Sequence, residues 1–345
     1  MTQTDLKAKL KSGNVCGWYI ICGEEEYLKR YYRGEIKKLI SADDDPFALF
    51  NHSSTDGADF DVMAFAEALK APPMMSDMKL VEWRFADLSK LKEDEIAEII
   101  SLAENKEDYP YATVIISTVP EGFDLGTQKR PSKLYSRLNP VFDIICFDKS
   151  TDAQLIAWLH RHFQSEGVAA SSEVLNALLM RVGHSMQSLN FEVDKLCAYA
   201  KANGKTEISL TDVEEIASAS IESDAFAISN SIIEKNIEKA FLALADMKQQ
   251  RIDAGAALAQ LSKTYGDLTS IALLMEEGKG ASDIAAIMKF HPYKLTLYMN
   301  AAKKLGARRI AESLNSLIKT DAASKAGGIS GYLAVEIFIT QNIGR

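Results

Sequence analysis

The spacing of apolar residues changes near residue 150 and does not change back. Before that point, short apolar runs typical of buried strands alternate with stretches in which apolar residues recur every three or four positions. After it, only the helical spacing is found. Strands that alternate with helices favour a parallel sheet, whereas a long helical remainder needs separate cores. The pattern therefore predicts an α/β domain followed by all-α domains.

Five strands are expected in the first part of the chain, at residues 17–22, 47–50, 79–83, 113–117 and 141–147. Residues 51–59 are polar and are expected to form a loop that leads into a helix ending at Leu69. The run 113–117 begins with four β-branched residues in succession, so it is the clearest strand of the five. Parallel pairing follows because a helical segment lies between successive strands.

Helices fill the rest of the chain. Three amphipathic helices and a shorter fourth helix are expected between residues 151 and 219, with Ser185 as the N-cap of the third. Seven further helices follow between residues 225 and 340, separated by glycines. A chain of 345 residues exceeds the usual size of one hydrophobic core. We expect three domains, at residues 1–149, 150–221 and 222–345.

Charge limits the kind of partner. The formal net charge is −9 and the pI is about 5.3, which argues against a broad basic surface for nucleic acid. Contact with DNA is therefore expected to be local or through a partner protein. No apolar run is long enough for a signal peptide or a membrane span, so a cytoplasmic protein without membrane contact is predicted.

The strand at 17–22 is followed by glycine and then by a helix, which is where a phosphate-binding P-loop would lie. That motif requires a second glycine, a lysine and a hydroxyl residue in fixed order. Here Gly23 is followed by Glu24, Glu25 and Glu26, whose charges would repel a triphosphate. We interpret these four residues as a degenerate P-loop.

Other chemistry finds little support. The acidic runs 24–26 and 43–45 lack the interleaved spacing of a cation site, and they are interpreted as solvated surface. No nucleophile and base occur in a recognisable arrangement. No metal, no cofactor and no catalytic residue is therefore predicted, and the chain is interpreted as a binding protein built on an enzyme-like domain.

A proline pair, Pro72 and Pro73, ends the helix that reaches Leu69 and is followed at once by Met74 and Met75. Methionines on such a turn either pack beneath the loop or project from it as adaptable contacts for a partner. Because most apolar residues are core residues, the residues alone favour the packed alternative.

Four stretches together resemble the delta subunit of the bacterial DNA polymerase III clamp loader. They are Tyr19-Ile-Ile-Cys-Gly-Glu-Glu-Glu-Tyr-Leu28, Pro73-Met-Met-Ser-Asp-Met-Lys-Leu-Val81, Gly183 followed by Leu189-Asn-Phe-Glu-Val-Asp-Lys-Leu196 and Tyr199, and Asp321 followed by Lys325-Ala-Gly327 and Glu336. Their order and spacing extend over nearly the whole chain. The resemblance implies an AAA+-like domain without a working P-loop, a helical lid and a C-terminal helical collar.

The resemblance also implies a function. Members of this family bind and open the ring-shaped sliding clamp, the beta subunit, for loading onto primed DNA, while partner subunits hydrolyse ATP. The anchor positions of the family fall on Met74 and Met75, with methionine in place of the usual aromatic residue at the second, and Leu69 and Met78 flank them. The resemblance thus favours exposed methionines.

Implied partners are the gamma/tau and delta-prime clamp-loader subunits and primer-template DNA, which Lys325 and its neighbours would approach. The chain is then a non-catalytic subunit of a DNA-directed DNA polymerase holoenzyme, in the nucleotidyltransferase class. The alternative is a nucleotide-regulated AAA+-type ATPase subunit of another DNA-processing complex, for which ATP binding by the isolated chain would be diagnostic.

Overall fold

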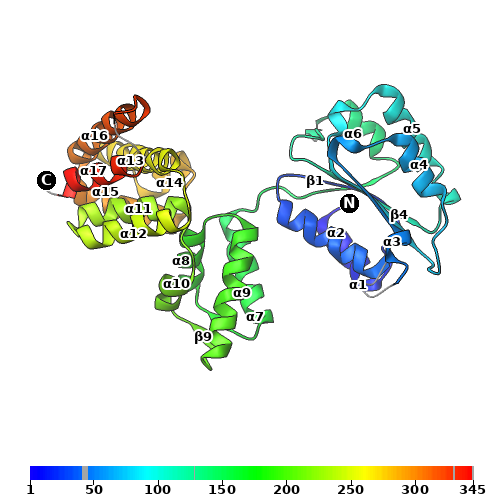
Figure 1. Ribbon diagram of the computed structural model, residues 1–345, viewed down its shortest axis with the longest axis horizontal. Helices are drawn as coiled ribbons and strands as arrows, with labels where there is room; N and C mark the ends of the chain where they lie inside the picture. Colours follow the sequence, from blue (N-terminus) through cyan, green and yellow to red (C-terminus); the bar gives the residue numbers. More distant parts are fainter. Residues whose placement is uncertain (41–45, 128, 329–330, 344–345) are drawn as a thin grey trace. The chain divides into compact units, whose positions relative to one another are not determined.

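The computed structural model describes residues 1–40, 46–127, 129–328 and 331–343. It divides into two compact units, Met1–Ser150 and Thr151–Arg345. The residue boundary predicted at 221 lies inside the second unit, so the three-domain division stays a prediction. Figure 1 shows a strand-and-helix first unit and a second unit that is almost wholly helical.

Five parallel strands form the sheet of the first unit, in the order β2-β3-β4-β1-β7. Its elements are α1 (Gln3–Ser12), β1 (Trp18–Cys22), α2 (Glu26–Ile40), α3 (Ala48–Asn51), β2 (His52–Asp56), α4 (Val62–Lys70), β3 (Lys79–Ala86), α5 (Glu93–Glu104), β4 (Ala112–Thr118), α6 (Lys133–Leu138) and β7 (Asp143–Cys146). Short 3-10 turns lie at Gly57–Asp59, Leu88–Lys90 and Lys106–Asp108, and a small antiparallel hairpin pairs β5 (Gly126–Thr127) with β6 (Arg130–Pro131).

Helices cover both faces of this sheet (Figure 1). Successive residues of β1 point to opposite faces, so Tyr19 and Ile21 pack with α1 and α2, while Trp18 and Ile20 pack with α4, α5 and α6. The central strands β1 and β4 are buried throughout, which explains why their sequences are continuous apolar runs.

The prediction for residues 47–50 is wrong. Residues 48–51 form the short helix α3, and the second strand is β2, which lies in the segment that was expected to be a loop. β2 lies at the edge of the sheet and has the polar sequence His-Ser-Ser-Thr-Asp, since an edge strand buries less surface than a central one. Conversely, Leu49 and Phe50 are apolar but exposed.

The second unit contains helices packed around one large apolar core and a smaller N-terminal group. The elements are α7 (Asp152–Ser165), β8 (Ala169–Ala170), α8 (Ser172–Val182), α9 (Met186–Ala202), β9 (Glu207–Ile208), α10 (Leu210–Ile216), α11 (Ile221–Ile233), α12 (Ile237–Gln249), α13 (Ala254–Glu276), α14 (Ala281–Met288), α15 (Pro292–Leu305), α16 (Ala307–Lys325) and α17 (Leu333–Ile343). Ser185 caps α9, as predicted. None of the helices among the described residues is long and apolar enough to cross a membrane.

Candidate functional site

The loop between α4 and β3 presents its two methionines to solvent. Met74 is 47% exposed and Met75 is 83% exposed. Met75 also has a φ of 52°, in the left-handed region that costs energy for any residue except glycine. An exposed, unbranched apolar side chain on strained backbone contributes nothing visible to folding, and strain of this kind collects at binding sites.

Asn51 fixes this loop from the end of α3. Its side-chain carbonyl accepts a hydrogen bond from the Met74 N–H at 2.7 Å, and its amide group donates to the Met74 carbonyl at 2.8 Å. Asn51 is fully buried. The two bonds satisfy both backbone groups of Met74, as a neighbouring strand would, so the loop is held in place without a strand beside it.

The preceding helix end is held as firmly. The ammonium group of the buried Lys79 donates to the carbonyl oxygens of Ala68 and Ala71, at 2.6 and 2.8 Å. The hydroxyl of Tyr111 donates to the carbonyls of Leu69 and Lys70, each at 3.2 Å. These donors bond to carbonyl oxygens that the end of a helix leaves unpaired. Burial of the Lys79 side chain lowers its pKa.

The two predicted flanking residues lie beneath the loop. Leu69 is fully buried among the residues between α4 and the sheet. Met78 is half-buried and packs against the core on the other face, and its N–H and carbonyl both bond to the Ser76 hydroxyl. Both residues can therefore support the loop from inside, but Leu69 offers no surface to a partner.

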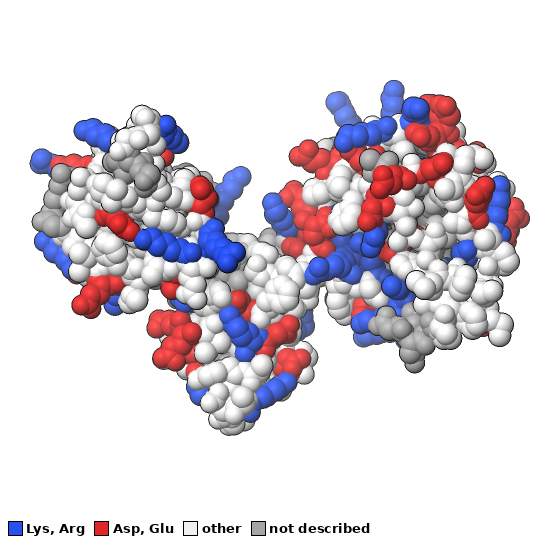
Figure 2. Space-filling view, in the orientation of Figure 1, with Lys and Arg blue, Asp and Glu red and all other residues white. Residues whose placement is uncertain are grey.

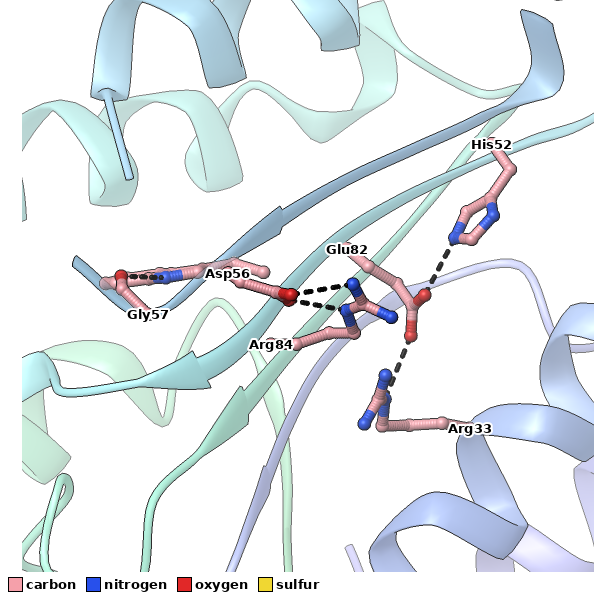
Figure 3. A network of polar contacts seen from close by, with 7 residues as sticks. Arg33, His52, Asp56, Gly57, Glu82 and Arg84 are labelled. Carbon is pink, nitrogen blue, oxygen red and sulfur yellow. Dashed lines mark hydrogen bonds and ion pairs between the residues drawn. The ribbon is translucent and has the colours of Figure 1, made fainter. Parts of the chain in front are cut away.

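A polar network, buried at Glu82 but partly exposed at Arg84 and Asp56, reinforces the adjoining strands (Figure 3). Glu82 of β3 accepts from Arg33 at 2.9 Å and lies 2.7 Å from the His52 ring, while Arg84 pairs with Asp56 through two bonds of 2.6 and 2.8 Å. Burial alone would raise the pKa of Glu82, but the His52 hydrogen bond and the Arg33 charge outweigh it and lower this pKa. The network links β2, β3 and α2.

The predicted degenerate P-loop lies at the carboxyl ends of the parallel strands, because Gly23 follows β1. The loop with Met74 and Met75 precedes β3 and lies at their amino ends. Gly23 has a φ of 100°, and a side chain there would overlap the backbone of Phe147. The Phe147 N–H donates to the Cys22 carbonyl at 2.7 Å, and its carbonyl accepts from the Glu25 N–H at 2.8 Å. A backbone donor that would otherwise face a phosphate is thus already used.

Each glutamate of this loop has a partner of its own. Glu24 pairs with Lys149 at 2.8 Å, a Glu25 carboxylate oxygen accepts from the Tyr27 N–H at 3.3 Å, and Glu26 pairs with Lys29. Burial raises the pKa of Glu25, against the opposing effect of its backbone hydrogen bond. The run is a set of separate contacts rather than a cation site.

Lys29 stands six positions after Gly23, where the P-loop motif has its lysine, and this coincidence was missed from the sequence. The side chain is fully buried, and its ammonium group donates to the Thr118 carbonyl at 2.7 Å as well as pairing with Glu26. Counting residues from Gly23 would have found it. The expected second glycine and hydroxyl are replaced by Leu28 and Arg30.

The remaining predicted positions add no further site. Residues 43–45 lie outside the described residues. Within the described ranges no three histidine, cysteine or acidic side chains come close enough to hold a metal ion. Lys325 is paired with Asp321 at 2.6 Å on α16. Acidic and basic side chains are interspersed over the visible face of each unit (Figure 2).

Comparison with a solved structure identifies the fold. A five-stranded parallel α/β unit followed by helical segments is the AAA+-like clamp-loader fold, and the predicted fold class is confirmed. The solved Bacillus subtilis DNA clamp loader delta protein aligns with a TM-score of 0.62 at 21% identity, over 99% of both chains.

Family models agree with this. The model for the DNA polymerase III delta subunit matches residues 19–133, and that for its C-terminal domain matches residues 222–342. The DNA polymerase III subunit delta of Bacillus subtilis is 22% identical over 99% of this chain and 97% of that protein. The probable delta subunit of Aquifex aeolicus is 23% identical, over 89% of this chain and 85% of that protein. The chain belongs to the family of DNA polymerase III delta subunits, the clamp-loader delta proteins.

Proposed function

We propose that this chain binds the sliding clamp, the beta subunit, through Met74 and Met75 and opens the ring so that it can be loaded onto primed DNA. The observation that carries the proposal is the exposure of Met75 on a strained loop that Asn51 holds in place. In a member of the delta family, such a loop is suited to insert into an apolar pocket. A few buried apolar anchors commonly supply most of the energy of an interface.

Opening follows from binding if the anchors fit one state better than the other. The free clamp is mostly closed. Binding of the loop changes the equilibrium between closed and open clamp only by the difference between its binding free energies for the two states. A rigid loop favours this, because less conformational entropy is lost on docking. The loop thus acts as a wedge that traps an open interface.

ATP hydrolysis is assigned to partner subunits. At the degenerate P-loop, the Glu25 N–H donates to the Phe147 carbonyl. The Lys29 ammonium group donates to the Thr118 carbonyl and pairs with Glu26. Nucleotide phosphates would have to displace these buried contacts and would meet a run of glutamates. The alternative, a nucleotide-regulated ATPase, is left with Lys29 as its one supporting residue.

The helices α11–α17 are proposed to join the collar of the clamp loader beside the gamma/tau and delta-prime subunits. Large apolar side chains such as Leu273 on α13 and Ile318 on α16 are about half exposed. Apolar surface on several helices of one unit is suited to subunit contacts. Primer-template DNA would pass within that assembly, in the cytoplasm.

Calorimetry of the purified chain with the clamp from the same organism tests the binding step without nucleotide. The wild type should bind, and the double variant Met74→Ala/Met75→Ala should not, with an unchanged melting temperature. A fluorescent ATP analogue titrated into the same chain should not bind. Clamp binding that survives in the double variant, or saturable analogue binding, would contradict the proposal.

A further inference from the structure

Helix α3 exposes two large apolar side chains that folding does not explain. Leu49 is 91% exposed and Phe50 is 63% exposed, although Asn51, the next residue, is fully buried. Residues of these types are usually buried in a stable domain, and neighbouring exposed ones usually mark a contact with another molecule.

This helix lies directly beside the loop between α4 and β3, residues 71–78, which we call the methionine loop. The Asn51 side chain makes two hydrogen bonds to the Met74 backbone. Asn51 follows Phe50 and Met74 precedes Met75, so these bonds hold the exposed ends of the two segments together. The topology requires the same closeness: α3 precedes β2 and the loop precedes β3, and these parallel neighbours are in register with His52 opposite Leu80. Amino ends of parallel strands meet at one edge of the sheet.

We infer that Leu49 and Phe50 form the second half of the clamp-binding surface, continuous with Met74 and Met75. This inference rests on the proposed function. A stable protein interface buries roughly 800 Å² of each partner, which is several times what two methionine side chains can offer. Asn51 ties the exposed apolar side chains of α3 to the loop, so the clamp that receives the methionines also covers α3.

The sheet holds α3 in position. His52 follows Asn51 directly and lies 2.7 Å from the buried carboxylate of Glu82, which Arg33 also holds (Figure 3). One end of α3 is thus fixed by the polar network and by Asn51. Leu49 and Phe50 are presented on a fixed support, which lowers the entropy cost of binding.

Titration of the full chain with the clamp, using Phe50→Ala and Leu49→Ala, tests the inference. Phe50→Ala should weaken binding roughly tenfold and Leu49→Ala several-fold, with unchanged melting temperatures because both side chains are exposed. Phe191→Ala is the matched control, since Phe191 is 62% exposed on α9 in the other unit and should bind like the wild type. Leu49→Arg, which places a charge in the contact, should weaken binding at least tenfold.

The outcomes separate the two proposals. If the wild type does not bind the clamp, the proposed function fails. If the wild type binds and Met75→Ala weakens binding while Phe50→Ala, Leu49→Ala and Leu49→Arg leave the affinity unchanged, the clamp is bound by the methionines alone and the role of α3 is overturned.

Discussion

Replacement of Met75 by glycine separates a binding role from a folding role. Met75 has a left-handed φ of 52° and an 83% exposed side chain. Glycine adopts that conformation without strain, whereas methionine does so at a cost of about 1 kcal/mol. Glycine also makes the unfolded chain more flexible, which costs about 0.5–1 kcal/mol. The free energy of unfolding should therefore change by less than about 1 kcal/mol.

Binding should change much more. Full burial of a methionine side chain contributes about 1.5–3 kcal/mol, and about four-fifths of this side chain is still exposed before docking. The loss is then about 2 kcal/mol, or roughly 30-fold in Kd. Met74 is 47% exposed, so Met74→Ala should cost about half as much free energy, or roughly fivefold in Kd.

The assay is calorimetric titration with the clamp, paired with thermal unfolding of each variant. Met75→Ala keeps the backbone strain and should weaken binding like Met75→Gly, which separates the side chain from the flexibility of the loop. Met63→Ala is the control, because Met63 is 63% exposed but lies at the start of α4. The start of α4 is near the carboxyl ends of the strands, away from the methionine loop. A large fall in melting temperature for Met75→Gly would show that Met75 serves folding, and an unchanged Kd would show that its side chain does not bind the clamp.

Three further changes test the support of the site and the helical unit. Asn51→Ala should weaken clamp binding by freeing the Met74 backbone, and combining it with Met75→Ala should cost less than the sum of the two losses. Additive losses in Kd would show that Asn51 does not act through the loop. Glu82→Gln should lower the free energy of unfolding at pH 7 by about 3 kcal/mol, measured by urea denaturation, because the largely buried Arg33 loses its charge partner. Since the folded pKa of Glu82 is depressed, the wild type should lose this stability as the pH falls below about 4.5 and through the folded pKa, and the variant should not. An equal pH dependence in both would contradict this. Burial and the nearby Asp246 raise the pKa of Asp224 to about 7, so ionisation destabilises the fold progressively from about pH 4 to above pH 7. Asp224→Asn should therefore raise the melting temperature at pH 8, by about 2–4 °C for each kcal/mol regained in a unit of this size, but change it little at pH 4. Equal effects at both pH values would contradict this explanation.

The parts of the fold that follow local rules could be predicted from the sequence. Buried central strands such as β1 and β4 are continuous apolar runs, and the caps of the helices are local side-chain signals. The polar sequence of β2 predicts a loop because strands are recognised by their apolar residues, which an edge strand can lack. The apolar residues of α3 predict a strand although this segment is a short helix. An apolar run that serves an interface looks the same in sequence as one that serves a core.

The sequence indicates the methionine loop because two prolines end the preceding helix. It does not indicate that Asn51 holds this loop in place. Asn51 is 23 positions from Met74, and nothing in its neighbourhood in sequence predicts two hydrogen bonds to that residue. Lys29 matches the spacing of a P-loop lysine, and only the fold shows that its ammonium group bonds to Thr118, 89 positions away. Contacts between distant segments depend on the topology of the sheet rather than on local pattern.

Fluorescence across one interface of the clamp ring measures whether this chain opens the ring. A dye pair that is quenched when the ring is closed would be placed on either side of one clamp interface. Addition of the wild-type chain without nucleotide should raise the fluorescence, and Met74→Ala/Met75→Ala at the same concentration should leave it unchanged. An unchanged signal at a saturating concentration of the wild-type chain, or an equal rise with the double variant, would show that Met74 and Met75 do not open the clamp.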